Sequence, residues 1–587
     1  MVKTPARWAL RDWLAAIGLF AATAAVILWQ NAHVAVLWDL SYVLDSAARI
    51  AQGQLPYRDF PFAHAPLTFV IQAAIIRLTG RVFFHHVLYA AITGGLGTVL
   101  TWRIALHSLL SRVNNAWLVS LILAAPLTVL GIYCILPLPS YDCDCVFAVL
   151  VAIYLLQRLR PPSSWLYAMT TGAALCLPLF FKQNIGLPFL AAACGILAVA
   201  LVAGMSGLLQ PPALDAPARA LSTRSIFTVL TGIAATLSAA LLVLHFTVGL
   251  GNYYHWTIQF AAQRRLPGLQ QMLGVYSDPQ LLWKLPCILA ALLLLRRAKA
   301  QWASLVALAL FAAPFVYTLC TLFIYDDADE RGDSLLALWP MLLILAAALA
   351  LWNLRTLRIK RRSRFHIAPI LPILILIAIH GAFMSQQLWG STYATWPLLI
   401  LLIAEMTAFL AEFKSPALDL GKITPAIAAG ISVTLLICGA FYTASEERLS
   451  YAKLPAEPTQ HSAFPQLKGL STPGPYLQDF DELLHYADAN IPQTDGIILI
   501  PGEDPFYFVT GRIPQFPVLL FDPATDPLSP AQVAEAASQH NIRWLIVKRN
   551  LQLTANPTPQ REATITQLQK KFKPAASLHA YDIYRIR

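Results

Sequence analysis

Acidic and basic side chains occur in a few short stretches between long apolar runs, and their types suit proton and phosphate chemistry. Asp39 directly follows the first apolar run, and Asp59 and His64 come later in the same loop. A carboxylate can take a proton from a hydroxyl group, whereas cationic side chains can hold a phosphate. Asp39 is therefore a candidate general base, Asp59 is a second candidate, and His64 is a candidate ligand for an anion.

Four further cations stand at the edges of apolar runs and are candidate phosphate ligands: Lys182, Arg264, Arg265 and Arg331. Each has a simpler explanation that the sequence leaves open. Lys182 can extend its ammonium from a membrane boundary into water, and Arg264 and Arg265 can anchor their loop to anionic lipid headgroups.

The carboxylates of the loop also have structural alternatives. Asp39 is well suited to cap the helix that follows it. Asp45 and Arg49 are four residues apart on one helical face and can form an ion pair, so Asp45 is expected to be structural. Asp59 follows Arg58 in a proline-flanked turn, which is a common place for Asp without any catalytic role.

A second acidic stretch, Asp142 and Asp144, stands at the start of an apolar run and is expected near the acceptor or a metal ion. Side chains at positions i and i+2 point apart on a helix, so two carboxylates alone are insufficient to enclose a hard cation. Their structural alternative is a solvated helix start. The sequence thus requires no cofactor and leaves a divalent metal open.

The elements that must position these residues are membrane helices. Of 587 residues, 57% are hydrophobic and 12% charged, with a mean hydropathy of +0.58. About 20 apolar residues cross a bilayer as a helix, because backbone polar groups must be paired within lipid. About thirteen spans are predicted, at 12–30, 82–103, 116–136, 145–157, 165–182, 185–204, 226–248, 281–295, 302–324, 334–352, 367–384, 396–413 and 424–443.

Basic residues concentrate in the short loops on one side of these spans, which is the arrangement typical of cytoplasmic loops rather than of nucleic-acid binding. We expect a multi-pass protein of the plasma (inner) membrane, with the N-terminus cytoplasmic and the C-terminal domain outside the cytoplasm. The outer loop 31–81 is expected to carry two interfacial helices, over Leu40–Gln52 and Ala65–Thr79.

From residue 444 onward no apolar run is long enough to span, so the chain divides into a membrane domain, 1–443, and an outer domain, 444–587. Short strands are predicted at Gly496–Pro501, Arg543–Lys548 and Ser577–Arg587, and helices at Pro530–His540 and Pro559–Phe572. This alternation predicts a small α/β domain without a glycine-rich phosphate loop or a nucleophile elbow.

The loop 38–67 resembles that of a known enzyme family. Asp39 after the first span is followed by A-x-x-x-x-x-G-x-x-P-Y-x-D-F over Ala47–Phe60, and then by His64, Ala65 and Pro66 ahead of an apolar segment. This order is similar to that of membrane glycosyltransferases of the C-type fold, which use polyprenyl-phosphate sugars. Protein O-mannosyltransferases, lipid A aminoarabinose transferases and the glycosyltransferases of families 39 and 87 are examples. Ala65 departs from the family, which commonly has a doubled proline here.

Three further stretches support the resemblance: Tyr141–Asp144, Phe181–Gly186 and Arg331–Pro340. It implies an inverting glycosyltransferase with about thirteen spans, acting at the outer membrane face. Its partners would be a polyprenyl-phosphate-linked sugar donor, a glycan, lipid or protein acceptor, and membrane lipids, with no nucleic acid. The resemblance implies that the lipid phosphate is bound by His64, Lys182, Arg264, Arg265 and Arg331.

Two other classes of protein fit the same composition. A transporter or flippase of lipid-linked sugar usually has paired repeats and ionisable residues near mid-span, whereas here the candidate charges lie at the outer ends of spans. A non-catalytic scaffold that presents its outer domain would need Asp39 only as a helix cap. The sugar and the acceptor are set by pocket shape, which the sequence does not determine.

Overall fold

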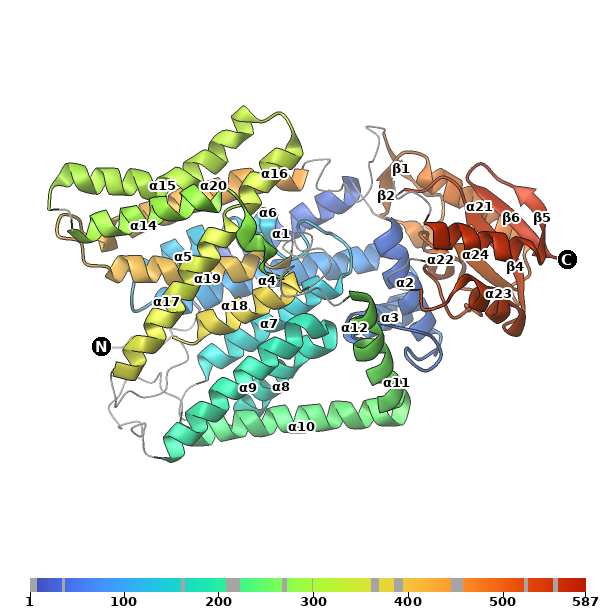
Figure 1. The fold of residues 1–587 in the computed structure, drawn as a ribbon, viewed down its shortest axis with the longest axis horizontal. Helices are drawn as coiled ribbons and strands as arrows, with labels where there is room; N and C mark the ends of the chain where they lie inside the picture. The colour runs from blue at the N-terminus through green and yellow to red at the C-terminus, as the bar shows by residue number, and fades with distance from the viewer. Residues whose placement is uncertain are drawn as a thin grey trace.

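The computed structural model describes residues 8–33, 37–159, 164–206, 222–265, 272–297, 299–359, 369–384, 394–444, 458–521, 526–552 and 558–587. Long helices run roughly along the longest axis of the molecule, and a small sheet with its own helices lies at one end (Figure 1). The predicted fold class, a helical multi-pass membrane protein with a small C-terminal α/β unit, is confirmed.

The helices of the membrane part begin and end close to the predicted apolar runs. Their bounds are α1 Leu10–His33, α4 Phe83–Leu109, α5 Ala116–Ala124, α6 Leu127–Leu130, α7 Tyr141–Arg158, α8 Trp165–Phe181, α9 Gln183–Met205, α10 Thr223–Thr247, α11 Leu250–Tyr254, α12 Ala261–Arg265, α14 Leu281–Arg297, α15 Gln301–Ile324, α16 Ala328–Leu336, α17 Trp339–Ile359, α18 Leu371–Phe383, α19 Trp396–Glu412 and α20 Leu420–Ala444.

Seven stretches of helix within the described residues are long and apolar enough to cross a membrane: Leu10–His33, Phe83–Leu109, Gln183–Met205, Thr223–Thr247, Gln301–Ile324, Glu330–Arg355 and Leu420–Ala444. The other six predicted spans also coincide with helices, which are shorter or carry more charge. A total of thirteen crossings therefore stays a prediction, whereas the presence of a helix in each predicted span is confirmed.

One predicted span, 116–136, is broken. The helix stops at Ala124 and a single further turn, α6, follows Pro126, because proline cannot donate to the preceding turn and its ring clashes there. Beyond α6 the chain is irregular, and Tyr133 adopts a positive φ of 68°. This irregular stretch brings the Tyr133 side chain to the start of α7.

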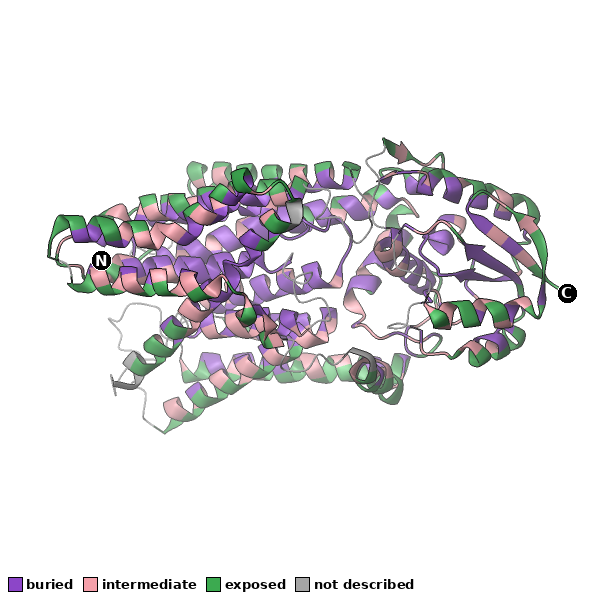
Figure 2. Ribbon diagram, turned by 45° about the horizontal axis from the view of Figure 1, so that its top comes forward, coloured by how far each residue is buried: buried purple, intermediate pink, exposed green. Residues whose placement is uncertain are grey.

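Both predicted interfacial helices form, as α2 (Leu37–Ala51) and α3 (Leu67–Thr79). An amphipathic interfacial helix usually turns its polar face to water. In α2, however, Ser41, Asp45 and Arg49, on the polar face, are each at most 4% exposed. They are covered by the C-terminal unit, which packs on α2 (Figure 2).

The C-terminal unit contains a four-stranded sheet of order β3-β4-β6-β5. Strands β3 and β4 are parallel, and the other two pairs are antiparallel. The predicted strands and helices are found, and the structure adds strands β1, β2 and β5 and helices α21 and α22. The bounds are β1 Thr459–His461, β2 Ser471–Pro473, α21 Tyr476–Asn490, β3 Gly496–Ile500, α22 Phe506–Thr510, α23 Pro530–Gln539, β4 Ile542–Lys548, α24 Pro559–Gln569, β5 Phe572–Ser577 and β6 Tyr581–Ile586.

The segments predicted for the outer face gather at one end of the molecule. Helices α2, α3, α11 and α12 lie on the side of the C-terminal sheet, whereas α14 ends and α15 begins at the opposite end (Figure 1). The candidate residues of the loop, of the start of α7 and of the α8–α9 junction can therefore meet beneath the C-terminal unit.

Candidate functional site

The centre of the candidate site is an ion pair between the Lys182 ammonium and the Asp142 carboxylate. Both residues are buried, at 8% and 4% exposure. The two residues are 40 positions apart in the chain, so their pairing could not be predicted from the sequence. An ammonium has three donors, so Lys182 can keep this pair and still donate to another anion.

Local backbone features place the two partners. The Ser140 side chain accepts from the backbone N–H of Asp142 (3.3 Å) and so caps α7. Lys182 is the single residue between α8 and α9. The sharp crossing of these helices depends on Gly186, because a Cβ there would lie 2.2 Å from the backbone nitrogen of Leu179. The Lys-x-x-x-Gly spacing thus positions the lysine.

Aromatic side chains connect this ion pair to the outer loop. The Lys182 nitrogen lies 5.3 Å from the ring centre of Tyr141. The Tyr141 ring in turn lies 4.5 Å from that of His64. The hydroxyl of Tyr42, on α2, is 2.7 Å from His64 Nδ1. The structure therefore brings His64 and Lys182 to the same tyrosine ring, and their binding of a shared ligand stays a prediction.

The backbone of the same loop is fixed at its base. The Gln183 side chain donates to the backbone oxygen of Ala63 (3.2 Å), and the Tyr57 hydroxyl donates to that of His64 (2.6 Å). Because these bonds join the loop to the start of α9, His64 is held beside Lys182.

Asp144 has a different environment from Asp142, as expected for positions i and i+2. Its carboxylate accepts from three hydroxyl groups, those of Thr68, Tyr89 and Tyr133, each at 2.7 Å. It is 1% exposed, so the alternative of a solvated helix start is wrong for both acids. These bonds join α7 to α3 and α4. No group of three or more His, Cys, Asp or Glu side chains in the described part of the chain is arranged to hold a metal ion.

Asp39 lies in the first turn of α2, one turn before Tyr42, and is half-buried. Helix α2 begins at Leu37, so Asp39 is its third residue and the predicted role as N-cap is wrong. The backbone N–H of Leu37 is instead bonded to the side-chain oxygen of Gln552 (2.7 Å). A carboxylate in this turn is still favoured by the helix dipole.

Asp45 is structural, but not through the predicted ion pair with Arg49. Its carboxylate accepts from the backbone N–H of Phe508 (2.7 Å), in the C-terminal unit. Burial raises the pKa of Asp45 well above its usual value, and the bond from Phe508 opposes this rise. Arg49 donates to Gln54 and to the backbone oxygen of Pro517 (2.8 Å), and burial lowers its pKa to about 10.

Asp59 lies in the predicted turn. It pairs with Arg58 (2.8 Å) and accepts from the backbone N–H of Leu55 (2.7 Å). The bond from Arg58 lowers the pKa of Asp59. The carboxylate closes the turn that leads to His64, which is the structural alternative given above for this residue.

The remaining candidate cations are not joined to this cluster by any contact found in the described residues. Arg331, on α16, donates to the backbone oxygen of Tyr325 (2.7 Å) and so closes the turn after α15. Arg264 and Arg265 end helix α12, and their side chains lie outside the described part of the structure. Helix α12 lies on the same side of the molecule as α2 and α3 (Figure 1).

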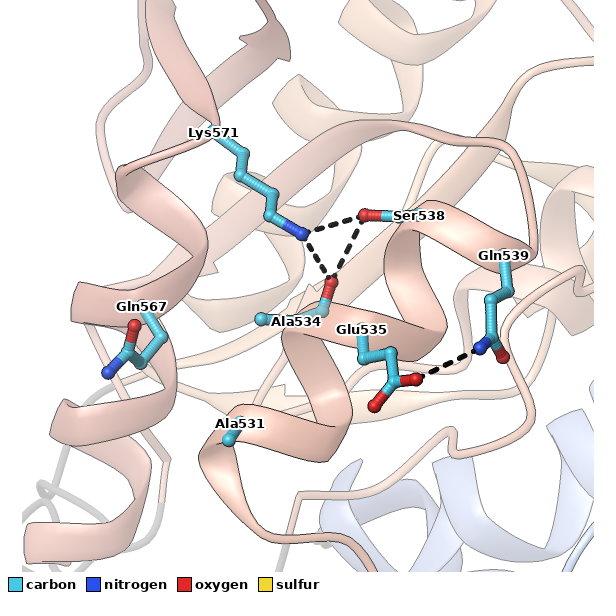
Figure 3. Close-up of a pocket in the computed structure, with 7 residues that line it drawn as sticks. All are labelled: Ala531, Ala534, Glu535, Ser538, Gln539, Gln567 and Lys571. Carbon is cyan, nitrogen blue, oxygen red and sulfur yellow. Dashed lines mark hydrogen bonds between the residues drawn. The ribbon is translucent and has the colours of Figure 1, made fainter.

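Two cavities lie on other elements. An apolar one of about 270 Å³ lies within the membrane part, between α14, α15, α17, α19 and α20. The other is a polar surface groove between α23 and the end of α24 (Figure 3). In this groove the Lys571 ammonium already donates to the backbone oxygen of Ala534 (3.0 Å) and to the Ser538 hydroxyl (2.7 Å). Neither cavity contains a residue predicted for the site.

Comparison with known proteins gives similarity in structure only. No protein-family model matches the chain, and a search of curated proteins found no match. The structure of ArnT from Cupriavidus metallidurans bound to undecaprenyl phosphate shares 14% identity over 98% of both chains, with a TM-score of 0.46.

An oligosaccharyltransferase from Archaeoglobus fulgidus in the apo form shares 12% identity over 97% of this chain and 74% of its own, with a TM-score of 0.47. The archaeal oligosaccharyltransferase AglB from the same organism, in complex with an inhibitory peptide and a dolichol-phosphate, shares 11% identity over 92% and 70%, with a TM-score of 0.43.

Several residues of the cluster were missed by sequence reasoning. Tyr42 contacts His64, and Tyr89 and Tyr133 bind Asp144. Tyr42 could have been predicted from the sequence, because it lies one helical turn after Asp39. Tyr89 and Tyr133 could not, because each lies on a separate element whose position is set by packing.

Proposed function

We propose that this protein is an inverting glycosyltransferase that moves a sugar from a polyprenyl-phosphate carrier to an acceptor at the outer face of the plasma membrane. The observation that carries the proposal is the cluster of Lys182, Asp142, Tyr141 and His64 beside the helix that bears Asp39. It provides a held cation and a carboxylate base at the same end of the helical bundle, where a lipid phosphate would meet water.

In the proposed reaction Asp39 takes the proton of the acceptor hydroxyl. The acceptor oxygen attacks the anomeric carbon of the sugar from the face opposite the phosphate, and the bond from that carbon to the phosphate oxygen breaks. The electron pair leaves with the carrier, which becomes a lipid phosphate. One attack of this kind inverts the configuration at the anomeric carbon.

Lys182 would stabilise the negative charge that develops on the departing phosphate. Its pair with Asp142 keeps the ammonium in place before the donor arrives, so little reorganisation is needed when charge develops. His64 can add a second hydrogen bond, since Tyr42 fixes its ring. Arg264 and Arg265 are proposed to complete the phosphate site from α12.

The proposal is tested with a deletion strain and with the purified protein. Mass spectrometry of envelope glycans and polyprenyl-phosphate sugars should show loss of one glycan modification and accumulation of its donor. The purified protein in lipid nanodiscs should then transfer that sugar. An unchanged glycan profile in the deletion strain, together with no transfer by the purified protein, would overturn the proposal.

The competing transporter function makes a different prediction. A transporter moves the lipid-linked sugar across the bilayer and leaves the sugar–phosphate bond intact. The test uses proteoliposomes that contain acceptor and a donor with a radiolabelled sugar. A transporter would move the labelled donor across the bilayer without release of lipid phosphate. The position of the charged cluster at one end of the helices favours the transferase.

A further inference from the structure

The C-terminal unit holds α2 along one continuous stripe of residues. Leu37, Ser41, Asp45 and Arg49 are spaced by four and therefore lie on one helical face. Besides the two bonds of Asp45 and Arg49 described above, the Ser41 hydroxyl donates to the backbone oxygen of Gly502 (2.8 Å) and the Leu37 N–H to Gln552. Asp39 lies between the contacts at Leu37 and Ser41, two residues from each, and Leu37 is the contact on the side of the helix start.

The Leu37 contact supplies the start of α2 with a hydrogen-bond acceptor. The first N–H groups of a helix have no acceptor within it and need one from elsewhere. Gln552, 515 positions away in the chain, provides the acceptor for Leu37, and both residues are at most 1% exposed. This buried bond fixes the first turn of α2. If Gln552 were removed, water could not reach the Leu37 N–H to replace it as acceptor.

Gln552 is itself held by a buried charged cluster. Its backbone N–H donates to the Glu503 carboxylate (3.0 Å). Glu503 and Asp504 both pair with the Lys548 ammonium, at 2.5 and 2.8 Å, and all three are 1% exposed. The Tyr581 hydroxyl donates to Asp504 (2.8 Å). Every member therefore has a fixed partner.

The charges of this cluster make it rigid. Burial disfavours the Lys548 ammonium, but Asp504 and Glu503 outweigh that effect and raise the pKa of Lys548. The lysine thus stays charged, and moving either carboxylate would separate buried opposite charges, which is costly. The sheet of the C-terminal unit is thus connected to the first turn of α2 through Lys548, Glu503 and Gln552.

We propose that Gln552 is a positioning residue for the transfer reaction, through which the C-terminal unit sets the place of Asp39. The proposal rests on the proposed function and gives the C-terminal unit a part in it. Removing the bond to Leu37 should let the first turn of α2 shift while the contacts at Ser41, Asp45 and Arg49 hold the rest of the helix. A displacement of about 1 Å at a catalytic group can lower a rate by as much as about a hundredfold.

The test compares two substitutions at the same interface in the full-length protein in nanodiscs. Gln552→Met removes the acceptor at nearly constant volume. The matched control is Gln52→Met, which removes the bonds from Gln52 to the backbone oxygens of Gly511 (2.9 Å) and Arg512 (3.5 Å). Gln52 directly follows α2 and lies 13 residues beyond Asp39, or about 20 Å away at the rise of a helix. Both variants lose hydrogen bonds between this segment of the chain and the C-terminal unit.

We expect Gln552→Met to lower kcat about 10- to 100-fold with little change in the KM for donor, and Gln52→Met to lower kcat less than about threefold. Adding Gln552→Met to Asp39→Asn should cause no further loss, because Gln552 acts through Asp39. Equal kcat values for the two glutamine variants, or a full further loss in the double variant, would overturn the proposal.

Hydrogen exchange tests the positioning role of Gln552 independently of the proposed transferase function. In Gln552→Met the amides of residues 37–40 should exchange faster than in wild type, while those of residues 45–49 stay protected. This measurement does not depend on sugar transfer. Unchanged exchange at residues 37–40 would refute the positioning role, whereas absence of transfer by the wild-type protein would refute the proposed function alone.

Discussion

Asp39→Asn gives the sharpest test of the proposed chemistry, because the structure removes the main structural explanation for this acid. Asp39 is the third residue of α2, and the first N–H of the helix is bonded to Gln552. The charge of a carboxylate in this turn interacts favourably with the helix dipole, by about 0.3–1 kcal/mol. Asn lacks that charge but keeps a side-chain oxygen that accepts hydrogen bonds, so the substitution should lower stability only slightly.

Helix α2 will not unfold over such a loss. Eleven of its 15 residues are buried, and the C-terminal unit holds it at four points. Loss of a general base, in contrast, commonly lowers a rate by about a hundred- to ten-thousand-fold. We therefore expect Asp39→Asn to keep its melting temperature within about 2 °C of wild type and to lose transfer almost completely.

The assay is sugar transfer by purified wild-type, Asp39→Asn and Asp39→Ala proteins at matched concentration. The controls are Asp45→Asn and Asp59→Asn, whose carboxylates bond to backbone N–H groups and, for Asp59, to Arg58. An Asn side chain can still accept from an N–H group, so both controls should remain active. Wild-type turnover in Asp39→Asn would refute the assignment, and loss confined to Asp59→Asn would move the base to that turn.

Three further predictions concern the donor site, pH and topology. Lys182→Met should lower kcat/KM for donor about 30- to 1000-fold, and the double variant Lys182→Met/Asp142→Asn should regain melting temperature but not transfer, because it leaves no unpaired buried charge. The raised pKa of Asp45 means that the folded protein binds this proton more tightly than the unfolded chain. The stability of the wild-type protein should thus fall as the pH rises from the usual carboxyl pKa to the raised one. Over this range the melting temperature of Asp45→Asn should increase relative to that of wild type. A constant difference would contradict the raised pKa of Asp45. A reporter active only in the cytoplasm, fused after Arg587, should be silent, and strong activity would reverse the predicted orientation.

The amino-acid sequence was sufficient to locate the long helices. Every predicted span coincides with a helix, because a long apolar run in lipid must satisfy its own backbone hydrogen bonds. The turn at Asp59 and helices α2 and α3 were predictable for a related reason, since turn residues and apolar periodicity act over a few neighbouring positions.

The partners of the polar side chains could not be predicted in this way. Asp142 lies on α7 and Lys182 at the junction of α8 and α9. Asp144 accepts from Thr68, Tyr89 and Tyr133, which come from three other segments. A buried acid needs hydrogen-bond donors, but its sequence neighbours do not identify them, because packing decides which elements meet.

The polar face of α2 shows the difference most directly. Periodicity alone correctly gave the amphipathic pattern, and water was the natural assignment for a polar face next to a membrane. The tertiary structure decided otherwise, since Gly502, Phe508 and Pro517 of the C-terminal unit supply the bonding partners of that face. A pattern of polar residues specifies a need for hydrogen bonds, and only the folded chain determines whether water or a distant segment meets it.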